Sequence, residues 1–196
     1  GVLDSIGNTP LVRLESLNTN PQAAVLAKLE GNNPGGSVKD RIALFMVRDA
    51  ERAGKIKKGD TILEATSGNT GIGLAMVGAA LGYKVVLTMP ECVSMERRKI
   101  LEAFGAELIL SPGCEGTDGA IRVARRVMDE AGTKYFMPNQ FDNPANVLAH
   151  YETTGREIIE QTGGRIDVFV AGMGTTGTLM GAGRRLREHD PKVRIV

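Results

Sequence analysis

Aromatic side chains and excess charge are both scarce in this chain. Phenylalanine, tyrosine and tryptophan make up 4% of the 196 residues, and tryptophan is absent. An aromatic platform for stacking nucleic-acid bases is therefore not expected. The formal net charge is only +1, so the sequence lacks the basic surface that would attract a polyanion or an anionic membrane. We expect neither a nucleic acid nor a membrane as a partner.

Cysteine and long apolar runs are scarce as well. The two cysteines, Cys92 and Cys114, have neither CxxC spacing nor the spacing of metal ligands, so we expect reduced thiols and no metal site. No apolar run is long enough to span a bilayer, and no signal peptide opens the chain. These features predict an intracellular protein of ordinary globular composition, 42% hydrophobic and 24% charged.

Glycine, in contrast, is abundant, and it clusters between segments of regular periodicity. Two short strand-like segments come first, and from Thr61 onward strand-like runs alternate with helical patterns. This alternation predicts an α/β fold with doubly wound, mostly parallel sheets. The strands are expected at 9–14, 23–29, 61–65, 84–89, 106–110, 134–137, 167–171 and 193–196, and the helices at 71–81, 94–104, 118–130, 146–161 and 178–188.

Glycines also mark the ends of three predicted helices. Gly82, Gly105 and Gly132 each lie just past a helical pattern, where a left-handed C-cap is common. The last predicted strand, 193–196, ends with the chain and would leave a parallel sheet uncovered. We therefore expect a fragment, or a chain that needs a partner.

A lysine in the segment 32–41 is the first candidate for chemistry. Ser37, with Asp40 three residues later, is close to a capping-box pattern. Lys39 would then lie in the first turn of a helix, where the positive end of the helix dipole favours a neutral amine. A neutral amine can attack a carbonyl group and form a Schiff base. The alternative is a solvated lysine next to an ion pair.

The first glycine-rich loop follows the strand predicted at 61–65 and enters a helix. Its hydroxyl groups and free backbone N–H groups would surround an anion at a helix N-terminus, and the carboxylate of a small substrate would fit there. The alternative is an N-cap followed by a tight turn. The residues of this loop are Thr66, Ser67, Gly68, Asn69, Thr70 and Gly71.

A second glycine-rich loop, 172–178, also joins a predicted strand to a helix. Its threonines add side-chain donors to the backbone donors, so that a phosphate group is the natural ligand. Gly172, Gly174 and Gly177 also match GxGxxG, the spacing of a dinucleotide site. A nicotinamide dehydrogenase is therefore an alternative, although such a site would not explain Lys39 or the first loop.

Two further polar residues, Gln140 and His150, lie between the two glycine-rich loops in the sequence. Gln140 follows the strand predicted at 134–137 and could donate to the same carboxylate as the first loop; the alternative is a loop glutamine with a local partner. His150 has no acid or nucleophile spaced to pair with it, and we expect it to be a packing or surface residue. Only Gln140 therefore joins the candidate site.

Taken together, these motifs resemble those of the cysteine synthase (O-acetylserine sulfhydrylase) family of fold-type II pyridoxal-phosphate enzymes. The resemblance covers essentially the whole chain, and 94–98 and 149–155 look more like the B-type members. Five motifs occur in the order of the family: IGNTPL, NPGGSVKDR, EATSGNTG, NQF and GTTGT, at 6–11, 33–41, 64–71, 139–141 and 174–178.

The resemblance implies pyridoxal 5′-phosphate as the cofactor. Lys39 would form the internal aldimine and act as the base at the substrate α-carbon, and Asn69 would hydrogen-bond the ring hydroxyl of the cofactor. The cofactor phosphate would lie against Gly174, Thr175, Thr176, Gly177 and Thr178. The substrate carboxylate would be bound by Thr66, Ser67, Gly68, Asn69, Thr70 and Gln140.

The implied function is cysteine biosynthesis. The acetoxy group of O-acetylserine would be replaced by sulfide or another sulfur donor through an α-aminoacrylate intermediate. Alternatives are an O-phosphoserine sulfhydrylase, a cystathionine β-synthase, or a truncated, non-catalytic binding module. The family further implies a cytoplasmic homodimer with serine acetyltransferase as a protein partner.

The resemblance also implies a division of the chain into domains. Residues 1–35 would be N-terminal strands of the large domain, 36–145 the smaller, mobile α/β domain, and 146–196 the first part of the large cofactor-binding domain. Family members are considerably longer, and a serine that binds the pyridine nitrogen lies in their C-terminal part. We therefore expect the large domain to be incomplete in this chain.

Overall fold

The structure is a computed structural model that describes residues 1–16, 18–131 and 135–196. Its largest sheet has four parallel strands in the order β5-β4-β3-β6. All of β3 and all but the first residue of β4 are buried, as expected for central strands that are covered on both faces. The strands are β3 (Thr61–Ala65), β4 (Lys84–Pro90), β5 (Glu107–Ser111) and β6 (Tyr135–Phe136).

Helices cover both faces of this sheet, and the alternation along β4 shows which helix covers which face. Leu87 belongs to the main apolar core, which it shares with residues of α1 and α2. The next residue, Thr88, points the other way and donates to the carbonyl oxygen of Ala120 in α4 at 2.9 Å. The helices are α1 (Lys39–Arg52), α2 (Asn69–Leu81), α3 (Met95–Ala103) and α4 (Gly116–Ala131).

A second group of elements follows β6. Its small apolar core consists of Ile158, Leu186 and Val193, with partly buried neighbours. Its elements are α5 (Pro144–Ala149), a π-helical segment (His150–Gly155), α6 (Arg156–Thr162), α7 (Gly177–His189) and the parallel pair β7 (Val168–Phe169) and β8 (Arg194–Ile195).

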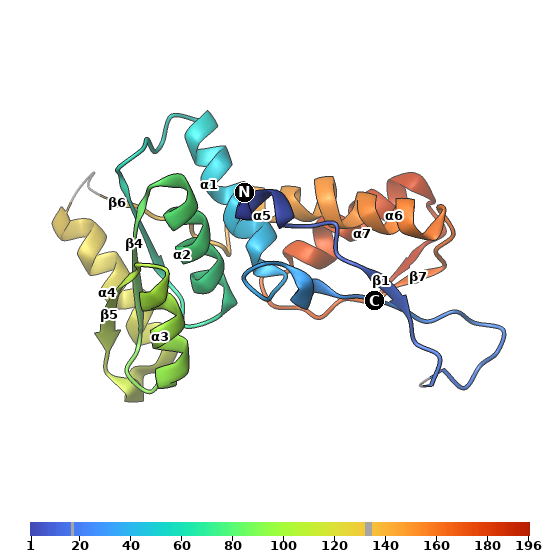
Figure 1. Cartoon of the computed structure of the whole chain (residues 1–196), viewed down its shortest axis with the longest axis horizontal. Coiled ribbons are helices and arrows are strands. Elements are labelled where there is room, and N and C mark those ends of the chain that lie inside the picture. The colour runs from blue at the N-terminus through green and yellow to red at the C-terminus, as the bar shows by residue number, and fades with distance from the viewer. Residues whose placement is uncertain (17, 132–134) are drawn as a thin grey trace.

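The N-terminal segment lies beside this second group. It contains the antiparallel pair β1 (Leu11–Arg13) and β2 (Leu26–Lys28), and β1 is drawn next to β7 in Figure 1. The four-stranded sheet with α2, α3 and α4 forms one half of the view, and α6, α7 and β7 form the other, with α1 and α5 between them. Short 3-10 helices complete the described chain at Val2–Ser5, Glu30–Asn32 and Gly113–Glu115.

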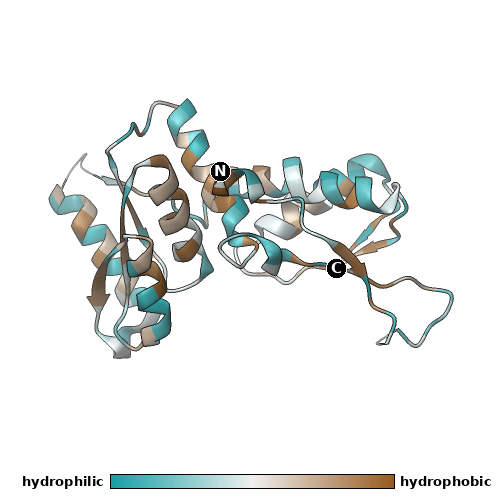
Figure 2. Ribbon diagram, in the orientation of Figure 1, coloured by the Kyte–Doolittle hydropathy of each residue, from teal (hydrophilic) through white to brown (hydrophobic). Residues whose placement is uncertain are grey.

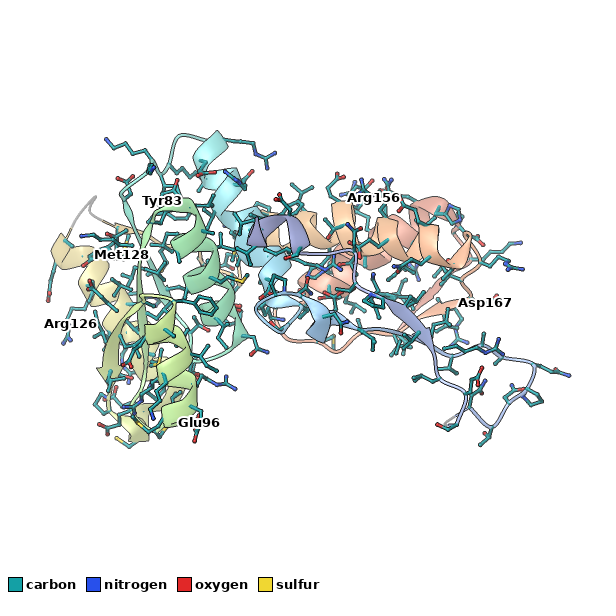
Figure 3. The ribbon with its side chains drawn as sticks, viewed as in Figure 1. Tyr83, Glu96, Arg126, Met128, Arg156 and Asp167 are labelled. Carbon is teal, nitrogen blue, oxygen red and sulfur yellow. The ribbon has the colours of Figure 1, made fainter. Side chains whose placement is uncertain are left out.

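The distribution of side chains follows this architecture. The strands of the four-stranded sheet are apolar, whereas α4 carries both polar and apolar residues around its axis (Figure 2). Charged residues such as Glu96 on α3 and Arg126 on α4 are exposed and point outward (Figure 3). No helix in the described ranges combines the length and the apolar character needed to cross a membrane.

The predicted α/β class with parallel sheets is confirmed, and every predicted strand has a counterpart among the described residues. Gly82 and Gly105 have φ angles of +80° and +82°, as the C-cap interpretation requires, and Gly132 lies outside the described residues. The predicted division into domains at 1–35, 36–145 and 146–196 stays a prediction.

The helix predicted for 146–161 is confirmed as a helical run, but its middle is not α-helical. The run consists of α5, the π-helical segment His150–Gly155 and α6, which follow one another directly. A Cβ on Gly155 would lie 2.7 Å from the Cβ of Arg185, so the π-helical segment and α7 are in close contact. Periodicity alone indicates a helix, but it does not reveal the wider turn that such a contact accommodates.

Candidate active site

Lys39 lies in the first turn of α1, where the sequence predicts it. The hydroxyl oxygen of Ser37 accepts the backbone N–H of Lys39 at 3.2 Å, at the start of the helix. The carboxylate of Asp40 accepts the N–H of Gly35 at 2.6 Å, and hydrogen bonds from the backbone of Gly35 and of Ser37 both act to lower its pKa against the effect of burial. Asp40 therefore fixes the loop that leads into the helix.

The environment of Lys39 disfavours its charged form. The side chain is half-buried, and burial lowers the pKa of Lys39, although the Glu30 carboxylate opposes this effect. Among the described residues, none forms a hydrogen bond with the Lys39 amine. An amine with a lowered pKa and no partner is available to act as a nucleophile or a base.

The first glycine-rich loop joins β3 to the N-terminus of α2. Thr66 is buried and its hydroxyl accepts the backbone N–H of Gly68 at 3.2 Å. Asn69 is exposed and opens α2. The N–H groups of the first helical turn have no partners within the helix, so this end of α2 can bind an anion.

Gln140 lies against this loop, although the two are 70 residues apart in the sequence. The hydroxyl of Thr70 donates to Oε1 of Gln140 at 2.6 Å, and both side chains are buried. The structure therefore brings together the first loop and Gln140, which were predicted to share a substrate carboxylate. The amide N–H groups of Gln140 are the donors that remain.

Asn146 connects this region to the second glycine-rich loop. Its Nδ2 donates to the backbone oxygen of Gln140 at 2.8 Å and to the hydroxyl of Thr175 at 2.9 Å. Asn146 was not predicted from the sequence, because neither of its partners follows from its position at the start of a helical pattern.

The second glycine-rich loop leads into α7 through an unusual backbone conformation. Thr176 has a φ angle of +63°, in the left-handed region that non-glycine residues seldom adopt. A Cβ on Gly177 would lie 1.9 Å from Oδ1 of Asn146, so that only glycine fits at this position. Free N–H groups at the start of a thirteen-residue helix, together with threonine hydroxyls, form a donor set that suits a phosphate group.

His150 is buried, which is one of the two settings predicted for it, and it contacts the second loop. Its ring is 1% exposed, with Nε2 at 3.2 Å from the hydroxyl of Thr178 and Nδ1 at 2.9 Å from that of Thr154. Burial, with the nearby charge of Arg41, lowers the pKa of His150 to about 4, so the ring is neutral at physiological pH. Its partner in the second loop, Thr178, lies 28 residues further along the chain.

Close helix packing places the start of α1 against α2, the helix that the first loop enters. A Cβ on Gly73 of α2 would lie 3.1 Å from the carbonyl oxygen of Lys39 and from the Cβ of Ala43. The N-terminal parts of α1 and α2 are thus in contact, and α5 packs against both α1 and α7. All the segments predicted to form the site are therefore joined through these four helices.

Comparison with known proteins decides the family. The family model described as "Pyridoxal-phosphate dependent enzyme" matches residues 2–196. The chain belongs to this family.

Individual relatives agree with this assignment. The chain is 57% identical over 192 residues to a cysteine synthase of Staphylococcus aureus, an alignment that covers 97% of this chain and 61% of the relative. The crystal structure of a cysteine synthase of Entamoeba histolytica is 44% identical, with a TM-score of 0.96, and the match covers 100% of this chain and 59% of that one.

A hydrogen sulfide-producing enzyme of Fusobacterium nucleatum is also similar. It is 45% identical, with a TM-score of 0.93, over 99% of this chain and 63% of that one. This pyridoxal-phosphate enzyme chain therefore spans about 60% of the length of the relatives that it matches.

Two residues after Lys39, this enzyme chain carries a buried guanidinium group. Arg41 is 1% exposed and binds two carboxylates, each through two nitrogens: Glu30 at 2.7 Å twice, and Glu157 at 2.6 and 2.8 Å. Lys28 also binds Glu157, at 2.6 Å. Burial acts to raise the pKa of Glu157, but Arg41 and Lys28 lower it to about 2. This cluster joins the N-terminal segment, α1 and α6 around the start of the helix that carries Lys39.

Proposed function

We propose that this chain carries the cofactor lysine and the substrate-carboxylate site of a cysteine synthase, which replaces the acetoxy group of O-acetylserine by sulfide. The observation that carries the proposal is the half-buried Lys39 amine, which has a lowered pKa and lies in the first turn of α1, a helix that packs against α2, the helix after the first loop. The identity of 57% to a relative named cysteine synthase supports it.

When bound, pyridoxal phosphate supplies an electron sink for a negative charge at the substrate α-carbon. In this proposal the Lys39 amine attaches to the cofactor and later moves the proton at that carbon. Residues 174–178 bind the cofactor phosphate, and Asn69 binds its ring hydroxyl. Residues 66–70 and the amide N–H groups of Gln140 bind and orient the substrate carboxylate.

A second candidate is the release of sulfide from cysteine. The similarity to a hydrogen sulfide-producing enzyme favours it, at 45% identity. Both reactions need a base at the α-carbon and a site for the carboxylate, so the same residues would serve both. Comparing turnover of O-acetylserine plus sulfide with sulfide release from cysteine separates the two.

The cellular location, the oligomeric state and the protein partner of the enzyme are part of the proposal. We infer a cytoplasmic homodimer that binds serine acetyltransferase, on the basis of the resemblance of the motifs to those of cysteine synthases. The division at 1–35, 36–145 and 146–196 belongs to the same proposal.

The decisive experiment is to replace Lys39 by alanine. We expect the Lys39→Ala variant to bind pyridoxal phosphate weakly and to lose turnover by about 10³-fold or more, because the base at the α-carbon is gone. The measurements are the visible absorbance of the bound cofactor with and without O-acetylserine, and the exchange of the substrate α-proton with deuterated water. Lys99→Ala, which removes an exposed amine from α3, is the matched control. Normal turnover in Lys39→Ala would refute the proposal.

A further inference from the structure

A buried carboxyl group lies directly before the first glycine-rich loop. Glu64 is the fourth residue of β3, two residues before Thr66, and it is 4% exposed. Its Oε2 has no hydrogen-bond partner among the described residues, and no cation in the described ranges forms an ion pair with it. Burying a carboxyl group without a cation costs folding free energy, so we expect Glu64 to have a role that offsets this cost.

The groups that face Glu64 are backbone amides. Burial raises the pKa of Glu64 to about 7, and hydrogen bonds from the backbone of Asn139, Ala65 and Gln140 act in the opposite direction. The register of the sheet explains this arrangement. β6 pairs with β3 in parallel, with Phe136 opposite Ile62, so the chain that leaves β6 passes the end of β3 at Glu64.

The turn that meets this carboxyl group has a left-handed backbone residue. Asn139 has a φ angle of +51°, a conformation that asparagine adopts more readily than most residues with a Cβ. The next residue is Gln140, whose side chain meets Thr70 at 2.6 Å and whose backbone oxygen accepts from Asn146. The direction of the turn therefore decides where the Gln140 amide lies.

We propose that Glu64 is a positioning residue: its carboxyl group holds the Asn139–Gln140 turn and so places the Gln140 side chain against Thr70. The consequence for substrate binding rests on the proposed function, in which Gln140 binds the substrate carboxylate. Glu64 itself contacts neither substrate nor cofactor in this proposal. A change at Glu64 should therefore alter the KM for the amino-acid substrate and leave the cofactor affinity and kcat nearly unchanged.

The test uses the holoenzyme at pH 8, above the pKa of about 7, with the variants Glu64→Gln and Glu64→Leu. Glu64→Gln has the same shape and keeps one weaker acceptor, whereas Glu64→Leu keeps none. We expect amide hydrogen exchange in a peptide covering 137–143 to accelerate about threefold in Glu64→Gln and about tenfold in Glu64→Leu, with parallel increases in the KM for O-acetylserine. Glu107→Gln, which alters an exposed carboxylate on β5 of the same sheet, is the control.

Each outcome decides the inference. Unchanged exchange in Glu64→Gln overturns it, whether or not Glu64→Leu folds. A loss of cofactor affinity parallel to the rise in KM also overturns it, because that result indicates a general structural role. Faster exchange with an unchanged KM overturns the positioning role if Gln140→Ala raises the KM. If Gln140→Ala also leaves the KM unchanged, the hold on the turn is supported and the proposed carboxylate site is the part that fails.

Discussion

At the scale of single residues, the site depends on buried polar side chains whose partners are distant in the sequence. Asn146 connects Gln140 to Thr175 and so links the residue that meets the first loop to the second loop. Each of its bonds contributes modestly, but a lost partner would leave a buried polar group unpaired, which costs more than the bond itself. Such a side chain helps to fix the distance between Gln140 and the second loop.

The contact between Asn146 and Gly177 gives a prediction on stability. A Cβ at residue 177 would lie 1.9 Å from the Asn146 amide oxygen, so we expect Gly177→Ala to lower the free energy of unfolding by about 1–3 kcal/mol. Gly172→Ala in the same loop is the matched control, because a Cβ there meets no atom within 4 Å. Urea unfolding of both variants measures the difference. Equal stability of the two would contradict the close contact.

At the scale of elements, the regular parts of the fold could be predicted from the sequence. The short strand-like run of β3, followed by a glycine-rich loop, and the glycines after α2 and α3 are local signals, and local signals indicate strands and helix ends. The π-helical segment His150–Gly155 could not be predicted, because helical periodicity does not distinguish a π-turn from an α-turn, and its close contact with α7 involves residues further along the chain.

The candidate site was predictable to the same extent. Its loops are contiguous motifs that carry their own chemistry, so Lys39 and both glycine-rich loops could be found. Asn146 was missed, and the contacts of His150 and Glu64 could not be predicted, because their partners include residues that only the folded chain brings near. Asp40 has a partner outside the predicted capping pattern, the N–H of Gly35.

The start of α1 offers a test at this scale. Ser37 is buried and caps the Lys39 N–H, so we expect Ser37→Ala to lower the free energy of unfolding by about 1 kcal/mol. The conservative variant Ser37→Thr keeps the hydroxyl acceptor and should lose less. The midpoints of urea unfolding compare the two. An alanine variant as stable as the wild type would show that this cap contributes nothing.

At the scale of the whole molecule, the Arg41 cluster determines a pH dependence. The pKa of Glu157 is about 2 in the folded protein, against an ordinary value of 4.5. A group whose pKa is lowered on folding stabilises the fold fully above its unfolded pKa. The contribution of Glu157 is therefore complete above about pH 4.5 and is lost as the pH falls towards about 2.

We expect Glu157→Gln to lower the free energy of unfolding by about 3–5 kcal/mol at neutral pH, because it leaves two buried cations with one acid fewer. This loss of stability relative to the wild type should shrink as the pH falls from about 4.5 towards 2. Glu160→Gln is the matched control on the same helix, since Glu160 is exposed and pairs with Arg156 at 3.6 Å; we expect it to cost less than about 1 kcal/mol. Thermal unfolding across this pH range measures both. Equal costs for the two variants would contradict the prediction.

The Arg41 cluster also bears on the order of events during protein synthesis. Arg41 precedes Glu157 by 116 residues, which corresponds to about 6–23 s of translation at 5–20 residues per second. Until Glu157 leaves the ribosome, the Arg41 guanidinium has one of the two carboxylates that bind it among the described residues, Glu30. We therefore expect the nascent segment around Lys39 to stay hydrated until α6 has been made, so that the proposed cofactor site forms late.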